Sequence, residues 1–422
     1  MNKTVKIICV LLAAAVCLPL AGCMVGPAAP GASSQIEPIQ PATPVQITGK
    51  VGLSDFDDSL IDFIMKSDLG SGNYMVSPLS LRVAVAMATA GAVGDTQKEL
   101  LKALGFETAD EMNEWAVGIN GLAAAFANKA ELVRKEQKEF GVSELPEWKF
   151  SIANSVWHNI TEREPLLDSY IERAARYFAA TAANSTKDKI VGDVNRWVNE
   201  KTEGLIRELI APDYDTEYVN TILTNTLYLK DAWLTPFEKQ ATFTDKFSRL
   251  SGGETEKEYM TVTDKFSYYE DEKTQLVTLP MGCEVKVTFV LGDLEGIGEK
   301  LEKAKNDYVL VKIPKFETET SLDKKELIDF LKAEGVTLAF DEHAADFSEM
   351  AVEQVFIGDI IQKTKIKVDE EGLEAAAATA VVMFDESSAD YPLNPKEFFA
   401  NRPFAYFITL SGELLFFGQI AE

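Results

Sequence analysis

Apolar residues follow a helical spacing in the earlier part of the chain. Leu60, Phe63 and Ile64 fall on one face of a helix. Residues 79–93 form an alanine-rich, almost entirely apolar run, which predicts a buried helix. Residues 96–99 read Thr-Gln-Lys-Glu, the pattern of a capping box, and predict the start of the next helix.

Alternating apolar and polar residues dominate the later part and predict β-strands. The apolar members of this pattern are Val285, Val287, Phe289 and Leu291, then Val309, Val311 and Ile313. Residues 404–410 and 414–417 flank Ser411–Glu413 and predict a hairpin. Helices first and strands later, with no repeat and no linker between them, predict a single α+β domain at residues 51–422 with large mixed or antiparallel β-sheets.

Residues 370–382 combine a helical propensity with a strand pattern. They read Glu-Glu-Gly-Leu-Glu-Ala-Ala-Ala-Ala-Thr-Ala-Val-Val. Alanines after acidic residues favour a helix start. Read with period 2, however, one face holds Leu373, Ala375, Ala377, Thr379 and Val381, and Glu374 lies on the other. Both readings stay open on the residues alone, and a segment in which propensity and pattern disagree is a candidate for two conformations.

The N-terminus predicts a lipoprotein signal peptide at residues 1–23. A positive start is followed by an apolar run that is too short to span a bilayer. The run ends in Leu-Ala-Gly-Cys, which resembles the bacterial lipoprotein processing box and implies lipidation of Cys23; an ordinary secretory signal is the alternative. Residues 24–50 are rich in Pro and Ala and predict a disordered tether. We therefore expect an extracytoplasmic protein, anchored to the bacterial membrane or cell surface only by lipid.

The formal net charge of −26 argues against a nucleic-acid partner and against docking on anionic lipid. Once the signal is removed and Cys23 is lipidated, Cys283 is the single remaining thiol, so no disulfide is expected within the mature chain. We expect Cys283 to be buried and structural.

The sequence supports no catalytic activity. Its two histidines, His158 and His343, lie in unlike contexts, the first on a predicted strand and the second in a polar turn. No metalloprotease, paired C-x-x-C, P-loop or dinucleotide motif is present. We expect a protein that is not an enzyme and that has no metal and no cofactor.

Six blocks, in order along residues 51–422, resemble those of the serpins, the serine-protease-inhibitor fold. They are NYMVSPLSL at residues 73–81, TNTLYLKDAWLTPF at 224–237, IPKF at 313–316, ADFSEM at 345–350, NRPF at 401–404 and FFGQ at 416–419. The resemblance implies a serpin-like fold with an exposed reactive loop at about residues 370–395. Together with the processing box that ends in Cys23, it suggests a bacterial lipoprotein-type member of the family.

The resemblance implies an irreversible suicide inhibitor of secreted serine, possibly cysteine, proteases. A target protease cleaves the loop and forms an acyl-enzyme, and the freed loop then inserts into the main sheet as a new strand. The implied hinge comprises Glu370, Glu371, Gly372, Leu373, Glu374, Ala375, Ala376, Ala377, Ala378 and Thr379. Leu373 departs from the small residue usual in the family. That departure favours the alternative of a non-inhibitory surface protein for binding, storage or adhesion.

The family's usual count from Glu370 places the scissile bond at Glu386–Ser387, or after Asp385 if the loop is one residue shorter. The expected partner is then an acid-preferring serine protease or a caspase-like enzyme. A shifted register would offer Phe384 to chymotrypsin-like, or Met383 to elastase- or subtilisin-like, proteases. We expect a monomer.

The resemblance also assigns residues that control opening of the sheet. Ser77, Ser80, Asn225 and Gln362 form the sheet-opening cluster. Gln362 stands where the family often has histidine, so no pH dependence is expected from that position. Glu370 is expected to pair with Lys315 near Trp233, closing the top of the sheet.

Overall fold

The computed structural model describes residues 54–142, 145–161, 164–216, 221–322, 324–358, 360–373 and 394–422. The expected signal peptide, Cys23 and the tether therefore lie outside the described residues. The helices are α1 (Asp55–Lys66), α2 (Pro78–Thr89), α3 (Gly94–Leu104), α4 (Ala109–Glu139), α5 (Asp168–Phe178), α6 (Ile190–Lys201), α7 (Ile297–Lys303) and α8 (Lys324–Ala333). Helices α1 to α6 precede β4 and the strands that follow it, in line with the helices-first pattern of the sequence, although β1, β2 and β3 lie among them.

Over the described residues the strands form two sheets. The six-stranded sheet has the order β10 (Phe316–Leu322), β11 (Gln362–Val368), β12 (Gly372–Leu373), β4 (Thr221–Ala232), β2 (Lys149–Asn159) and β3 (Thr181–Ser185). The nine-stranded sheet has the order β1 (Tyr74–Val76), β15 (Glu413–Ile420), β14 (Phe404–Leu410), β8 (Val285–Gly292), β7 (Thr274–Pro280), β6 (Glu254–Glu270), β9 (Lys305–Pro314) and β13 (Lys396–Phe399), with β5 (Phe243–Ser248) paired to β6.

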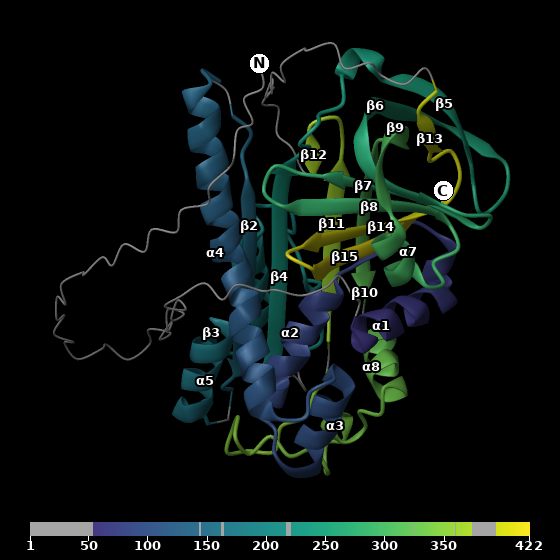
Figure 1. Cartoon of the computed structure of the whole chain (residues 1–422). Coiled ribbons are helices and arrows are strands. Elements are labelled where there is room, and N and C mark those ends of the chain that lie inside the picture. Colours follow the sequence, from purple (N-terminus) through teal and green to yellow (C-terminus); the bar gives the residue numbers. More distant parts are fainter. Residues whose placement is uncertain are drawn as a thin grey trace. The chain divides into compact units, whose positions relative to one another are not determined.

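Both sheets are mixed. The pairs β2–β3 and β9–β13 are parallel, whereas the other pairs in the described part of the chain are antiparallel. Figure 1 shows the long helix α4 beside β2, and β7, β8 and β14 crossing the direction of β2 and β4. The predicted α+β fold class is confirmed.

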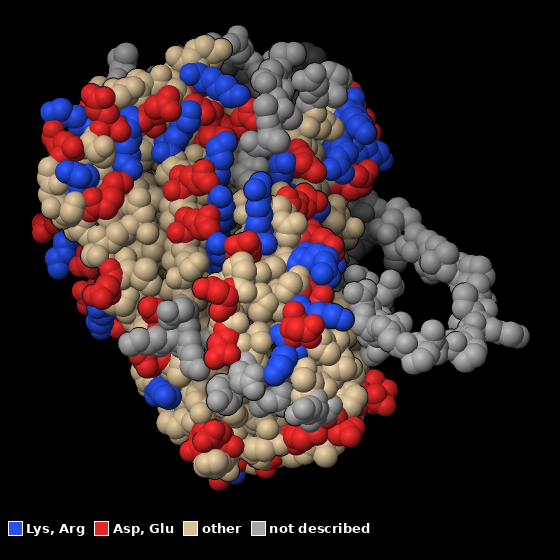
Figure 2. Space-filling model, turned by 180° about the vertical axis from the view of Figure 1, so that it is seen from behind, with Lys and Arg blue, Asp and Glu red and all other residues tan. Residues whose placement is uncertain are grey.

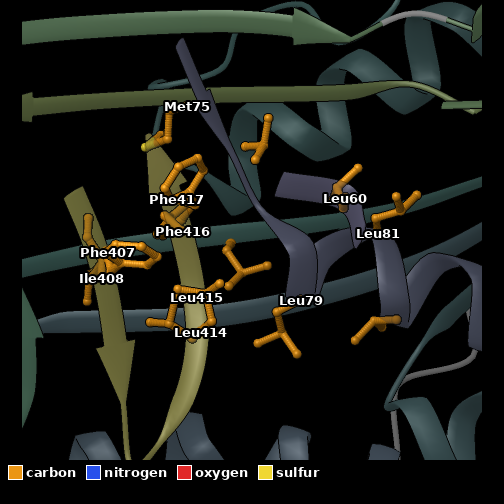
Figure 3. Close-up of a cluster of buried hydrophobic side chains, with 14 of the residues drawn as sticks. Leu60, Met75, Leu79, Leu81, Phe407, Ile408, Leu414, Leu415, Phe416 and Phe417 are labelled. Atoms are coloured by element: carbon orange, nitrogen blue, oxygen red, sulfur yellow. The ribbon is translucent and has the colours of Figure 1, made fainter. Parts of the chain in front are cut away.

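The core lies between the sheets and the first helices. Figure 3 shows Leu79 of α2 near Leu414 and Leu415 of the C-terminal hairpin, and Leu60 of α1 beside Leu81 of α2. Strands β14 and β15 are buried along most of their length, on both faces. Such strands read as nearly continuous apolar runs because each face is covered by another layer. The predicted hairpin and the alternating strands β8 and β9 are confirmed.

The predicted capping box is wrong. Helix α3 begins at Gly94, and its N-cap, Val93, makes no side-chain cap hydrogen bond. Thr96 Oγ1 instead accepts a hydrogen bond from the backbone N–H of Asp346, at 3.0 Å. The Glu99 carboxylate accepts the backbone N–H of Leu338, at 2.8 Å. Both side chains tie α3 to a distant segment, so tertiary partners displaced the local interaction that the sequence pattern predicts.

The surface carries charges of both signs. Figure 2 shows acidic and basic side chains interspersed on one face. On that face the two signs alternate, and no wide area of one sign is visible. Within the described residues, no helix combines the length and the apolar character needed to cross a bilayer.

Candidate functional site at the hinge of the six-stranded sheet

Two hinge residues form the strand β12 between β4 and β11. Gly372 pairs with Ala232 and Leu373 with Asp231, both antiparallel. On the other side Leu373 pairs with Val368. We call this arrangement the seated hinge. Figure 1 shows β12 at the upper end of β4 and β11. Because β4 and β11 flank a third strand here, the sheet is spread by the width of one strand, about 4.8 Å per neighbour.

Gly372 is required where the hinge approaches β4. Its φ is 153°, a conformation that residues with a side chain rarely adopt. A Cβ at this position would lie 2.1 Å from the backbone oxygen of Asp231. No larger residue therefore fits without displacing the hinge from its pairing with β4.

Leu373 is held in the core and is 1% exposed. It lines a cavity of about 20 Å³ together with Leu227 and Leu229 of β4, Ile366 of β11 and Phe416 of β15. The side chain that departs from the family's usual small residue thus lies among apolar neighbours. This position agrees with the strand reading of the segment, in which Leu373 belongs to the inward face.

Two side chains, Lys315 and Thr242, hold the Glu370 carboxylate against the sheet. Its Oε1 lies 3.4 Å from Lys315 Nζ and accepts a hydrogen bond from Thr242 Oγ1 at 2.7 Å. Lys315 also lies 3.5 Å from Glu258. Burial acts to raise the pKa of Glu370, but the Thr242 hydroxyl and Lys315 outweigh it and hold that pKa below its usual value. The structure therefore brings together the two residues of the expected hinge-closing pair.

Trp233 holds the same segment through its backbone and its ring. Its backbone N–H donates to Glu371 O at 3.1 Å, and its indole N–H donates to Asp369 O at 2.8 Å. Its ring packs edge-on against Phe237 with centroids 5.6 Å apart. The Glu371 carboxylate is paired with Lys239. The residues just before the seated hinge are thus fixed on both backbone and side-chain atoms.

Gln362 and Ser77 form the centre of the sheet-opening cluster. The backbone N–H of Ser77 donates to Gln362 Oε1 at 3.0 Å, and Gln362 Nε2 donates to Ser77 O at 2.8 Å. The Ser77 hydroxyl donates to Leu415 O at 2.7 Å. Gln362 lies in the six-stranded sheet and Leu415 in the nine-stranded sheet, so Ser77 connects the two sheets.

The other two cluster residues extend these hydrogen bonds. Ser77 Oγ accepts the backbone N–H of Ser80 at 3.2 Å, and Ser80 Oγ donates to Asn225 O at 3.3 Å. Asn225 Nδ2 then donates to Asn154 Oδ1 of β2, at 2.6 Å. The structure thus brings all four predicted residues of the cluster together, and adds Asn154.

Sequence reasoning missed two threonines in the same region. Met75 of β1 donates its backbone N–H to Thr320 Oγ1 at 2.9 Å, and its carbonyl accepts from Thr364 Oγ1 at 2.6 Å. Both threonines are buried. In the sequence Thr320 alternates with Thr318 along β10, whereas Thr364 is the single threonine of β11. Exposed strands share such patterns, so neither residue stands out.

Several predicted site residues lie outside the described residues. They are Glu374, Ala375, Ala376, Ala377, Ala378, Thr379, Glu386 and Ser387. In the part of the chain that the structure describes, no group of three or more His, Cys, Asp or Glu side chains could hold a metal ion. The site as described consists of a strand seat, an ion pair and a hydrogen-bonded cluster. These parts are suited to controlling the position of a strand.

The serpin family model, described as serine protease inhibitor, matches residues 53–422, so the chain belongs to the serpin family. An uncharacterized serpin-like protein of Methanosarcina mazei is 29% identical over 370 residues, covering 82% of this chain and 81% of that protein. Intracellular coagulation inhibitor 2 of Tachypleus tridentatus is 29% identical over 375 residues, covering 83% and 86%. The crystal structure of Serpin48 of Tenebrio molitor superposes with a TM-score of 0.68 at 26% identity, covering 87% and 96%.

Proposed function

We propose that this serpin is an irreversible conformational-trap inhibitor of secreted serine, possibly cysteine, proteases. The observation that best supports this proposal is the seated hinge, in which Gly372 and Leu373 pair with β4 and Leu373 also pairs with β11. The first two residues of an inserting strand therefore already occupy the position that the following residues would extend after cleavage. Membership of a family of protease inhibitors supports the same function.

Insertion would supply the energy for trapping. Each added backbone hydrogen bond contributes about 0.5–1.5 kcal/mol net. Over roughly a dozen residues the sum is on the order of 10 kcal/mol, similar to the total stability of a typical domain, about 5–15 kcal/mol. A protease esterified to the moving loop would therefore meet a driving force large enough to distort its own fold.

The proposed scissile bond is Glu386–Ser387, and the proposed targets are acid-preferring serine proteases or caspase-like enzymes. A bond after Asp385 keeps this specificity. Bonds after Phe384 or Met383 would direct the inhibitor to chymotrypsin-like or to elastase- and subtilisin-like enzymes. These assignments follow the loop count from Glu370.

The test is incubation of the protein with a glutamate-specific serine protease, followed by a denaturing gel and a thermal melt. A trap inhibitor gives a complex that survives detergent, and its cleaved form melts at a higher temperature than the intact form. Two fragments without a complex, and without a gain in melting temperature, would refute the trap mechanism.

Two matched substitutions assign the bond. Glu386→Ala should abolish the complex with the glutamate-specific enzyme, whereas Asp385→Ala should leave it intact. If Asp385→Ala alone removes the complex, the bond is one residue earlier. If neither does, mass spectrometry of the released fragment identifies the bond. A complex formed only with a chymotrypsin-, elastase- or subtilisin-like enzyme, with cleavage after Phe384 or Met383, excludes the acidic specificity.

We also propose that Cys23 carries lipid and that residues 24–50 tether the inhibitor outside a bacterial cell. The Leu-Ala-Gly-Cys sequence at residues 20–23 supports this proposal. Metabolic labelling with a radioactive fatty acid in a bacterial host should label the wild type and not Cys23→Ser. Equal labelling of both proteins would contradict it.

A second candidate function, a non-inhibitory binding protein, is favoured by a cavity of about 740 Å³ between α7 and the nine-stranded sheet. Its lining includes the buried side chains of Phe266, Thr288 and Phe407. Its exposed charged residues are two lysines and one acid, Lys265, Lys286 and Glu302. A small molecule with an apolar body and an acidic group fits this chemistry, and the volume falls within the usual range for ligand pockets.

The fluorescent probe 1-anilinonaphthalene-8-sulfonate, which is apolar and anionic, tests this candidate. Thr288→Trp would fill the cavity and should reduce binding of the probe, whereas Thr261→Trp on β6, outside the cavity lining, should not. Equal binding to the wild type and to both variants would exclude the cavity as a ligand site.

A further inference from the structure

Asp231 is a buried acid directly opposite the hinge. It lies in β4 and is 1% exposed. Its register partner is Leu373. Opposed residues of an antiparallel pair share one face of the sheet, with Cβ atoms about 4.5–5.5 Å apart. Leu373 therefore covers the carboxyl with apolar surface, and the seated hinge keeps it from water.

The Asp231 carboxylate is held by backbone donors. Oδ2 accepts the N–H of Cys283 at 3.1 Å, and Oδ1 accepts the N–H of Ala232 at 2.9 Å. A Cβ at Gly282 would lie 3.3 Å from Oδ1, so the turn between β7 and β8 packs closely on this group. Asp231 thus connects β4, which pairs with the hinge, to the β7–β8 turn of the nine-stranded sheet.

No lysine, arginine or histidine of the described residues forms an ion pair with Asp231. The charged side chains around it are engaged with other partners. On the turn and α4, Glu284 pairs with Lys129 at 3.2 Å, and Arg134 lies 5.7 Å from the centre of the Trp148 ring. On β4, Lys230 pairs with Glu147 at 2.6 Å. Beside the hinge, Asp369 pairs with Lys367, Glu370 with Lys315 and Glu371 with Lys239.

Burial raises the pKa of Asp231 to about 7, although the N–H groups of Cys283, Ala232 and Gly282 act to lower it. The adjacent thiol of Cys283 also has a raised pKa, because of burial first and the charge of Asp231 second. The ionised form of Asp231 is therefore the costly one in this arrangement.

We propose that Asp231 is a positioning residue for the hinge: its neutral carboxyl keeps Leu373 seated between β4 and β11, and its ionisation favours release of the hinge. The proposal rests on the proposed function in treating this segment as a moving hinge. Release removes the apolar cover and gives the carboxylate access to water, which relieves the cost of the charge.

The direction of the pH effect follows from linkage. A carboxyl exposed after release has an ordinary pKa of about 4. Between about pH 4 and pH 7 the seated state then binds more protons than the released state. The equilibrium ratio of seated to released hinge therefore rises up to about tenfold for each unit that the pH falls. Above about pH 7 both states are ionised and the effect saturates.

Neither histidine of the chain can account for such a change at the hinge. His158 pairs in register with Thr221 at the start of β4, whereas Asp231 is near its end. At about 3.3 Å per residue, the two lie roughly 30 Å apart along the strand. His343 is exposed in a turn. The position of Asp231 thus gives this serpin a pH response that Gln362 cannot provide.

Hydrogen exchange of the full chain, expressed as protection factors to remove the intrinsic effect of pH, tests the proposal. The amides to follow are those of Trp233 and Asp369, which donate hydrogen bonds to Glu371 O and Gly372 O of the segment that forms the seated hinge. In the wild type their protection should rise roughly twentyfold from pH 7.5 to pH 5.5. In Asp231→Asn it should be high at both pH values, and in the control Asp245→Asn on exposed β5 it should follow the wild type.

Leu373→Ala provides a second variant that leaves Asp231 intact. The smaller side chain shields the Asp231 carboxyl less from water, so the midpoint of the pH-dependent change in protection should move to lower pH. A flat profile in the wild type, or an unchanged slope in Asp231→Asn, would overturn the proposal. These measurements need no protease: a pH-dependent seat in a protein that traps no protease would refute the proposed function and leave this inference standing.

Discussion

The side-chain amide of Gln362 makes two hydrogen bonds with the backbone of Ser77, one in each direction, at 3.0 and 2.8 Å. Ser77 is 1% and Gln362 7% exposed, so neither backbone group of Ser77 has an alternative in water. The pair joins the start of α2 to the first residue of β11, whereas Leu373 pairs with Val368 at the other end of that strand.

Gln362→Leu should destabilise the fold strongly. The substitution keeps the volume but leaves one donor and one acceptor of Ser77 buried without partners, at about 1–3 kcal/mol each. We expect the free energy of unfolding to fall by about 2–5 kcal/mol in urea titrations. Lys363→Leu, at the adjacent and partly exposed position, is the control and should change it by less than about 1 kcal/mol. Equal stability of the two variants would show that the pair contributes little.

Gly372→Ala should prevent the hinge from seating. A Cβ there would overlap the backbone oxygen of Asp231, and the φ of 153° is strained for alanine. The variant should be cleaved by the target protease as a substrate, with the fraction that forms a complex reduced at least tenfold. Gly192→Ala on helix α6, where a Cβ meets nothing within 4 Å, is the matched control and should inhibit normally. If Gly372→Ala forms the complex normally, pairing of the hinge with β4 is not required for inhibition.

The pair Glu370–Lys315 should stabilise the protein at neutral pH and less in acid. The pKa of Glu370 is lowered in the fold, so its contribution is fully present above its ordinary pKa, near 4.3, and is lost as the pH falls through the lower folded value. The melting temperature of the wild type should exceed that of Glu370→Gln at pH 6, and the difference should shrink towards pH 3. Glu397→Gln, which loses a more exposed pair with Lys312, should differ less from the wild type. A difference independent of pH would contradict the assignment.

Cys283 should resist thiol reagents until the protein opens. It is 1% exposed, and burial raises its pKa, so little reactive thiolate is available. In a variant with Cys9, Cys17 and Cys23 changed to Ser, labelling in native buffer should be at least about 100-fold slower than in guanidinium. Comparable rates in both solvents would show that the turn between β7 and β8 is accessible in the native state.

The sequence predicts the general organisation of the fold well, because apolar spacing reports burial directly. The spacing of Leu60, Phe63 and Ile64 marks α1, and the alternation from Val285 to Leu291 marks β8. Helix ends are less secure: α2 ends at Thr89, although the apolar run continues to Val93. Thr96 and Glu99 satisfied the local rule for a capping box, but distant backbone N–H groups bind them instead.

The candidate site was predictable only as far as the family resemblance reaches. The resemblance led to Gln362, Ser77 and the pair Glu370–Lys315, all of which the structure brings into contact. Asp231 was not identified from the sequence. It could have been, because Asp231 falls on the same strand face as Leu227 and Leu229, and strands seldom place Asp on a buried face. Thr320 and Thr364 gave no such signal, since only the approach of β1 distinguishes them from surface threonines.

Strands β14 and β15 lie between β1 and β8 in the larger sheet, although residues 404–420 are made long after both of those neighbours. When residues 54–373 have been synthesised, the larger sheet still lacks the two strands that separate β1 from β8. Until the last hairpin is made, β8 has an unpaired edge, and unpaired strand edges of incompletely folded chains promote association with other chains.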